Sequence, residues 1–338
     1  MMNYDALTRG LAKVEVKVTT GKKPLMGIVN MLLPEGTGTD QDVVKYSYED
    51  NGTEIPEQAV RGADPTRVNY GTPFNEDYIK GAYFFPEQTL NLAAAQNRLF
   101  EEPMDTPWSI EQRELHLTAV VRDKMHRGFD YAKLTLAKSA IFTGKFEAKD
   151  GGTQSFPVVS TNLALAGANL TTTPIKVLSA AMAPIIKAGN RVSRLIVNPN
   201  TAATLMASEA WLKLLSAQHV NTDLDPATVD DNGMAYIGSI PAAGARISLY
   251  VCYATVNGSD YFIDDNKAIL CGDVIGRMDY CGVLQANGEV QAQVAAKELY
   301  TVYGENHGAL VSTKIQGQTA PCPIITNIDG YGIITGIS

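Results

Sequence analysis

The stretch SIEQRELHLTAVVRDKMHRGFDYAKLTLAKSAIFTGK, residues 109–145, decides the fold class because it predicts one very long helix. Ser109 and Gln112 have the spacing of a capping box, in which two side chains satisfy backbone N–H groups at a helix start. Gly144 supplies a residue that readily adopts the left-handed conformation at a helix end. A helix over 110–143 would be about 50 Å long at the standard rise of about 1.5 Å per residue.

Apolar or small residues recur along this helix at steps of three or four, which is the pattern of one buried face. They are Leu117, Val121, Met125, Phe129, Ala132, Leu136 and Ala140. The average helix has only about 11–12 residues. A large surface must therefore lie along this one.

The residues before the helix predict elements whose apolar side chains need a surface from elsewhere to cover them. Residues 1–40 lack a long periodic segment, which is typical of an extended arm held by other surfaces. Residues 43–49 alternate with period 2 and predict a strand, and Asp50-Asn51-Gly52 predicts a tight hairpin turn. Prolines interrupt the returning chain, so we expect the 41–75 segment to project as a two-stranded loop whose apolar residues need a partner.

The residues after the helix predict an α/β unit with a mixed sheet. A second helix opens at Thr173-Pro174 and should be kinked or split by Pro184. The strand 194–199 runs into a third helix, and two later strands flank a turn at 256–259. This alternation of strands and helices indicates a domain that begins near residue 172.

The composition is that of a soluble globular chain, with 45% hydrophobic and 19% charged residues among 338. The net charge is −8 and no dense run of Lys and Arg occurs, which argues against specific DNA or RNA recognition. No apolar run approaches the roughly 20 residues that span a bilayer, and the N-terminus MMNYDALTRG lacks an apolar signal region. We expect a protein made and kept in a cytoplasm, without membrane contact.

The cysteines form neither a C-x-x-C pair nor another common zinc spacing. They lie among apolar or small residues, which predicts reduced thiols in the core. No metal and no cofactor are expected. The four residues are Cys252, Cys271, Cys281 and Cys322.

The sequence contains none of the common catalytic or nucleotide-binding motifs. G-x-S-x-G, H-E-x-x-H, the P-loop and G-x-G-x-x-G are absent, and Gly36-Thr37-Gly38 lacks both a third glycine and a preceding strand. His116 and His126 are ten residues apart on the long helix and cannot jointly hold a metal. His219 is a favourable cation after a helix.

Other polar residues that could carry chemistry receive structural interpretations. Asp230-Asp231 and Asp264-Asp265 are adjacent pairs that do not converge easily on one cation, so a turn is favoured for both. Trp211 and its neighbouring leucines indicate a core helix face. His307, expected in a loop beside Glu305, has no identifiable second group for general-base catalysis. No catalytic residue is predicted, and the chain is expected not to be an enzyme.

Several stretches resemble the Hong Kong 97-type capsid subunits of tailed bacteriophages, with the closest likeness to lambda-type major capsid proteins, capsid family E. The likeness covers most of the chain in order, as patterns of apolar positions and turns. The stretches are TPFNEDYIKGAYFFPEQTLNL (72–92), LAKSAIFTGKF (136–146), RLIVNPNTAATLMASEAWLKLL (194–215), DYFIDDNKAILCGDVIGRMDYCG (260–282) and LVSTKIQGQTAPCPIITNID (310–329).

The resemblance implies an α+β fold of the Hong Kong 97-like capsid type, with five parts. They would be an N-terminal arm at 1–40, an E-loop β-hairpin at 41–75, a P-domain at 76–171 with the spine helix 110–143, an α/β A-domain at 172–277, and closing strands of the P-domain at 278–338.

The same resemblance implies a structural subunit of an icosahedral or prolate phage head. Copies of the chain would assemble as hexamers and pentamers into a shell around double-stranded DNA, touching the DNA without sequence preference. Scaffold and portal proteins, and in some systems a decoration protein, would be further partners. No long scaffolding segment precedes the arm, so a separate or removed scaffold is expected. The location would be the virion, after assembly in the host cytoplasm.

The oligomer interface is expected in the projecting loop and in an acidic loop of the A-domain at 221–233. The candidate residues are Tyr46, Tyr48, Asp50, Asn51, Gly52, Ile55, Asp223, Asp225 and Asp230.

Three alternatives stay open on the sequence alone. An encapsulin-like compartment shell would have the same fold, but its subunits are smaller and lack the extended loop-return segment. An α/β hydrolase or transferase within 172–277 would need a pocket with convergent polar groups and a perturbed titratable residue. A tail-tube or baseplate protein would be rich in strands and would lack the long helix.

Overall fold

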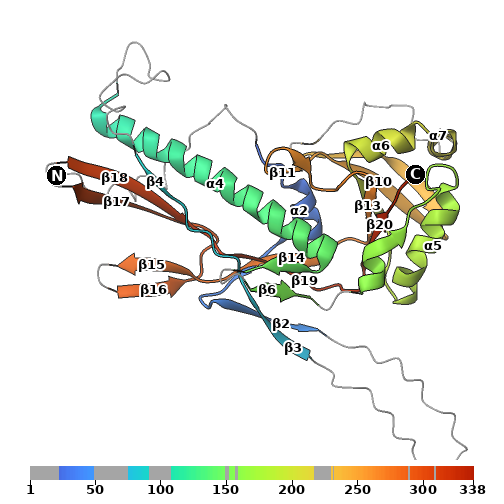
Figure 1. The fold of residues 1–338 in the computed structure, drawn as a ribbon, viewed down its shortest axis with the longest axis horizontal. Helices are drawn as coiled ribbons and strands as arrows, with labels where there is room; N and C mark the ends of the chain where they lie inside the picture. The colour runs from blue at the N-terminus through green and yellow to red at the C-terminus, as the bar shows by residue number, and fades with distance from the viewer. Residues whose placement is uncertain are drawn as a thin grey trace, which may run out of the picture.

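The computed structural model describes residues 23–48, 75–90, 108–148, 152–156, 159–216, 230, 232–287, 290–307 and 310–338. The predicted long helix is confirmed as α4, Ile110–Thr143, which crosses the molecule (Figure 1). The Ser109 side chain accepts a hydrogen bond from the Gln112 N–H, and the Gln112 side chain accepts one from the Ser109 N–H. Gly144, with φ of 65°, ends the helix in the left-handed conformation.

The predicted apolar stripe is the face that α4 buries. Leu117 and Ala132 are half-buried, and the other five predicted positions are buried. This face contacts β18, Leu310–Gln318, and β19, Pro321–Ile325. Strands from the end of the chain therefore supply the large surface that so long a helix requires.

A three-stranded β-ribbon runs along the N-terminal half of α4 (Figure 1). Strand β17, Leu299–His307, pairs antiparallel with β18, which in turn pairs antiparallel with β4, Glu87–Thr89. A small apolar cluster joins this ribbon to the helix. Its buried members are Leu90, Val121, Met125, Val302 and Ile315.

The centre of the molecule is a second three-stranded sheet of β1, Glu35–Gly38, β14, Gly276–Tyr280, and β19. Strand β1 is parallel to β14, and β14 is antiparallel to β19. Helix α2, Gly27–Leu32, precedes β1 and buries its apolar side chains in the main core. The expectation of an arm held by other surfaces is therefore wrong for residues 27–33, which pack within their own chain.

Strand β2, Val43–Tyr48, confirms the strand predicted at 43–49. Its antiparallel partner is β3, Asn75–Lys80, with Tyr48 opposite Asn75. The tight turn predicted at Asp50-Asn51-Gly52 therefore does not join these two strands. The turn itself and the rest of 49–74 lie outside the described residues.

A short hairpin of β5, Lys145–Glu147, and β6, Thr153–Ser155, follows α4. The backbone N–H of Lys80 in β3 donates to the Gln154 side chain at 3.2 Å, which ties this hairpin to the β2–β3 pair.

The predicted α/β unit is built on a six-stranded mixed sheet in the order β7-β20-β13-β8-β10-β9, with α5, α6 and α7 at the same end of the molecule (Figure 1). Strand β8 is parallel to β10 and antiparallel to β13. Two strands, β7 and β20, come from outside 172–277, so the sheet extends beyond the predicted range of this domain. The bounds are β7 Leu165–Ala166, β8 Arg194–Val197, β9 Met234–Ala242, β10 Ala245–Cys252, β13 Lys267–Cys271 and β20 Tyr331–Thr335.

The helices of this unit differ from the prediction in three details. Helix α5, Pro174–Lys187, continues through Pro184 without the predicted split, and Thr173 makes no capping hydrogen bond with its side chain. The single helix predicted after β8 is two helices, α6, Pro199–Met206, and α7, Glu209–Ser216.

The remaining elements are short. The predicted turn at 256–259 is confirmed, because β11 and β12 flank Asn257 and Gly258, both with positive φ.

No helix among the described residues combines the length and apolarity needed to cross a membrane. The other bounds are β11 Thr255–Val256, β12 Asp260–Tyr261, β15 Val283–Asn287, β16 Val290–Val294 and the 3-10 helix Ser160–Ala164.

Candidate functional site

Of the residues predicted to form the oligomer interface, the structure shows one buried and one exposed, and most lie outside the described residues. Tyr46 is only 5% exposed, and its ring packs on Phe156 with centroids 6.5 Å apart. It belongs to the core of its own chain and offers little surface to a neighbour. Asp230 is exposed. Its carboxylate accepts a hydrogen bond, 2.7 Å long, from the backbone N–H of Met234, the first residue of β9. Tyr48 ends β2, and the remaining candidates, Asp50, Asn51, Gly52, Ile55, Asp223 and Asp225, lie outside the described residues.

The residues considered for catalysis or phosphate binding mostly have structural roles. Gly36-Thr37-Gly38 belongs to β1, and the Thr37 N–H donates to the Asp279 carboxylate at 3.0 Å. His307 and Glu305 belong to β17, so the loop predicted there is wrong. The His116 ring packs on Trp108, whereas His219 lies outside the described residues.

Asp264 and Asp265 turn to different partners, as expected for neighbours that do not share a cation. Asp264 accepts from Lys138 of α4 at 2.6 Å and from Lys267 at 2.8 Å. Asp265 accepts from the Asn198 side chain at 2.5 Å. Both carboxylates thus fasten neighbouring elements together.

Trp211 is confirmed as a core residue. It is fully buried, and its indole N–H donates to the carbonyl oxygen of Leu170 at 2.8 Å. The hydrogen bond satisfies its polar atom in an otherwise apolar cluster.

A partly buried polar cluster, with an exposed His126 at its edge, joins α4 to the start of β17. Its central residue is Glu298, which accepts hydrogen bonds from His126 Nδ1 at 2.7 Å, Lys133 Nζ at 2.9 Å and the Tyr300 hydroxyl at 2.7 Å. Lys133 also lies 3.4 Å from Asp130. We call these five residues the Glu298 cluster. Its ion pairs are shielded, since the Lys133 and Glu298 side chains are 7% and 14% exposed.

The pKa values in the cluster follow from burial and from these contacts. Burial raises the pKa of the Glu298 carboxyl, but the His126 hydrogen bond and the Lys133 charge outweigh it and lower the pKa to about 2. The hydrogen bond to Glu298 raises the pKa of His126. Burial lowers the pKa of Lys133, yet the charge of Glu298 raises it above its usual value overall. Burial raises the pKa of Asp130.

The Glu298 cluster could be read as a metal centre, because donor atoms of His126, Asp130 and Glu298 lie within 4.8 Å of one another. Lys133 already places an ammonium group between the two carboxylates, and it neutralises one of their two negative charges. The cluster also borders a hollow of about 460 Å³ that α2 and β14 help to line. We interpret it as an ion network that holds α4 against β17.

Only the part of this cluster that lies on the helix could be found from the sequence. His126 and Asp130 are four residues apart, which places them on one face of the helix. Glu298 could not be found in the same way, because it is 172 positions from His126.

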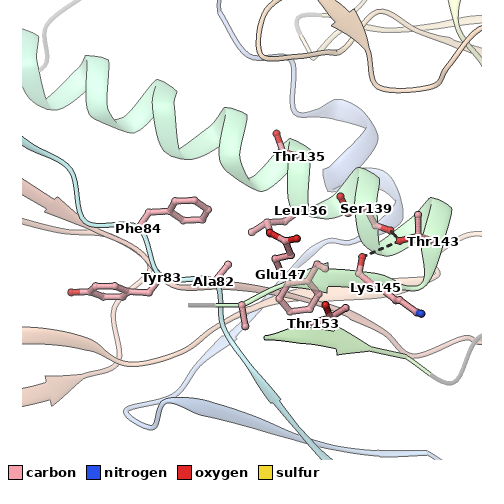
Figure 2. A pocket seen from close by; sticks show the side chains of 12 residues that line it. Ala82, Tyr83, Phe84, Thr135, Leu136, Ser139, Thr143, Lys145, Glu147 and Thr153 are labelled. Atoms are coloured by element: carbon pink, nitrogen blue, oxygen red, sulfur yellow. Dashed lines mark hydrogen bonds between the residues drawn. The ribbon is translucent and has the colours of Figure 1, made fainter. Parts of the chain in front are cut away.

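A long groove follows the exposed side of α4. Two adjoining hollows of about 520 and 600 Å³ share Tyr83 and Phe84. Figure 2 shows the first, where the C-terminal part of α4 faces the 82–84 segment and β5. We call the whole surface the α4 groove. On the helix it is lined by Lys124, Gly128, Ala132, Thr135, Ser139 and Thr143, and opposite the helix by Tyr83, Phe84, Phe85 and Phe146.

A separate apolar surface lies on the α/β unit. Ile175 of α5 and Leu212 of α7 are 44% and 51% exposed. A hollow of about 470 Å³ between these helices is lined mainly by apolar side chains together with Lys176 and Lys213. This hollow lacks the convergent polar groups that the enzyme hypothesis for 172–277 requires.

Comparison with solved structures defines the class of fold. The chain matches a prophage protein of Escherichia coli CFT073, provisionally assigned as a capsid protein, with 14% identity, a TM-score of 0.66 and coverage of 99% of both chains. It also matches the mature capsid of bacteriophage PhiM1, with 9% identity, a TM-score of 0.49 and coverage of 95% of this chain and 90% of that one. An encapsulin of Synechococcus elongatus PCC 7942 matches with 11% identity, a TM-score of 0.44 and coverage of 99% and 95%.

No protein-family model and no curated protein matches the sequence. The fold is therefore established by structure alone. It is a mixed α+β fold of the phage capsid type, as the sequence predicted, and it extends over the full length of the prophage protein.

Proposed function

We propose that the chain is the structural subunit of a tailed-phage head and assembles with copies of itself into the shell around double-stranded DNA. The observation that carries the proposal is the fold shared with the prophage protein over 99% of both chains. The long helix, the α/β unit and the closing strands all take part in this match. The chain would act as a building block and not as an enzyme.

Two parts of the chain suit a contact between neighbouring copies. Residues 49–74, which connect β2 to β3, include the apolar side chains of Ile55, Val60 and Val68. The α4 groove offers aromatic side chains on the side opposite the helix, among them Phe85, which is 48% exposed. We assign this groove as the surface that receives the 49–74 segment of an adjacent subunit. Many such contacts, each weak, would hold the shell together.

The finer organisation follows the same proposal. Hexamers and pentamers would bring the 221–233 loops, including Asp223, Asp225 and Asp230, close to the symmetry axes. A scaffold and a portal protein would direct assembly in the host cytoplasm, and a decoration protein would be optional. The net charge of −8 is compatible with a shell that lies beside DNA without binding it tightly.

A loop deletion tests the proposed contact. Because Tyr46 is a core residue and β2 pairs with β3, the deletion must leave both strands intact. Replacing residues 51–72 with a short Gly-Ser linker should give a subunit that unfolds cooperatively but forms no shells in electron micrographs. A control that replaces 51–72 with a Gly-Ser segment of equal length should also fail to assemble. Shells formed by either variant would contradict the role assigned to this loop.

A further inference from the structure

The four cysteines are all buried and free, but their surroundings differ. Cys252 and Cys271 lie in apolar environments, where burial raises the pKa of each thiol to about 12. Cys281 and Cys322 form a hydrogen bond to each other through their thiols. Only the second pair is arranged for chemistry between two sulfurs.

The contact between Cys281 and Cys322 follows from the register of the central sheet. Cys322 of β19 lies opposite Asp279 of β14, and the Cys281 N–H donates to the Ala320 carbonyl at 2.9 Å. Opposed residues and alternate residues share one face of an antiparallel pair. Cys281 and Cys322 are therefore diagonal neighbours on the same face.

The two thiols have different acidities. The hydrogen bond from Cys322 lowers the pKa of Cys281, and the same contact raises the pKa of Cys322. Because the thiolate is the reactive form of cysteine, Cys281 is the nucleophile and Cys322 the partner that holds the proton.

Cys281 also borders a small hollow of about 80 Å³, between Asp42, Lys80 and Gly81, which Cys322 does not line. A Cβ atom at Gly81 would lie 2.7 Å from the Cys281 sulfur, so a glycine is needed there to leave room. A cavity needs about 10–15 Å³ of such volume to hold one water molecule. The hollow thus has room for a molecule as small as hydrogen peroxide beside Cys281.

We propose that Cys281 and Cys322 form a peroxide-sensitive dithiol that closes to a disulfide between the strands of the central sheet. The Cys281 thiolate attacks one oxygen of hydrogen peroxide, forming a sulfenic acid and releasing hydroxide. The released hydroxide takes the proton of Cys322 to form water, and the Cys322 thiolate then attacks the Cys281 sulfur and displaces hydroxide. Two thiols are oxidised and one peroxide is reduced to water. This inference does not depend on the proposed function.

The reaction needs a shift of the two strand ends as well as of the side chains, because diagonal partners lie about 7–8 Å apart and a disulfide joins Cα atoms about 4.4–6.8 Å apart. The sulfurs must approach from hydrogen-bond contact to about 2.05 Å. The new bond would close the chain between residues 281 and 322 and limit its freedom when unfolded. Such a bond would form once the protein leaves a reducing cytoplasm, and it would raise the midpoint of thermal unfolding.

Thiol counting and peptide mapping test the proposal on the native, full-length chain. Peroxide treatment followed by denaturation and alkylation should lower the number of free thiols from four to two and yield a linked peptide of Cys281 and Cys322. Cys252 and Cys271 serve as internal controls and should stay alkylated in full. Retention of four free thiols, any other pairing, or sulfinic acid at Cys281 beside a free Cys322 would overturn the proposal.

Variants separate the two roles. Cys322→Ala should stop at the sulfenic acid of Cys281, which dimedone traps, whereas Cys281→Ala should show no oxidation at Cys322. The opposite pattern would reverse the roles and contradict the assignment. The wild-type measurement remains decisive if either variant fails to fold.

Discussion

Glu298 shows how one residue can connect distant parts of this chain. It lies just before β17 but bonds to His126 and Lys133 of α4, and these contacts fix the helix to the β-ribbon. Buried charges are costly unless they are paired. The stability of the cluster should therefore depend on every partner being present.

Removing the Glu298 charge tests this dependence. Glu298→Gln leaves Lys133 buried with Asp130 as its main counter-charge, so the free energy of unfolding should fall by about 3 kcal/mol. Urea unfolding of the subunit measures the loss. Glu35→Gln is the matched control, because Glu35 pairs with Lys297 on the surface, where both side chains are about half exposed. That variant should lose less than about 1 kcal/mol, and equal losses would contradict the account.

The free energy of unfolding at acid pH should depend on the protonation of the same carboxylate. The pKa of Glu298 is about 2 in the folded chain and 4.5 ordinarily, so its stabilisation is present above pH 4.5 and is lost as the pH falls toward 2. Wild type should lose on the order of 3 kcal/mol through this group over that window. Unfolding curves of wild type and Glu298→Gln between pH 2 and 6 should converge at the acid end. Parallel curves would show that the carboxyl is not perturbed.

At the scale of elements, local signals were predictable and distant pairings were not. The capping box, the apolar stripe and Gly144 lie within one stretch of chain, and they defined α4 correctly at both ends. Strand β2 was also predicted, but its partner was not, because β3 returns only after residues 49–74. The C-terminal strand β20 joins the sheet of the α/β unit for a similar reason. Its pairing depends on tertiary packing that no periodicity encodes.

The α4 groove can be probed at Gly128, which lies in the middle of the helix with open space where a Cβ would be. Gly128→Ala should stabilise the subunit by about 0.5–1 kcal/mol, because glycine loses more freedom than alanine in a helix. Gly128→Leu should leave the subunit folded but fill the groove and reduce assembly. Thermal unfolding and sedimentation of the same samples separate the two effects. Normal assembly of the leucine variant would contradict the assignment of the groove.

At the scale of the whole molecule, the order of elements carried more information than any motif. The sequence has no catalytic fingerprint, yet the arrangement of long helix, α/β unit and closing strands matches the prophage protein from end to end. The Glu298 cluster and the α4 groove were not predictable, because each is assembled from segments far apart in sequence. The proposed function follows from this global likeness and from the surfaces that the fold leaves open.

Electron microscopy of the purified wild-type chain, expressed alone and with a scaffold protein from the same genome, tests the central claim most directly. We predict closed shells built of hexamers and pentamers, with sedimentation in the range of whole particles. A chain that stays monomeric under both conditions, at every concentration up to its solubility limit, would contradict its role as a capsid subunit.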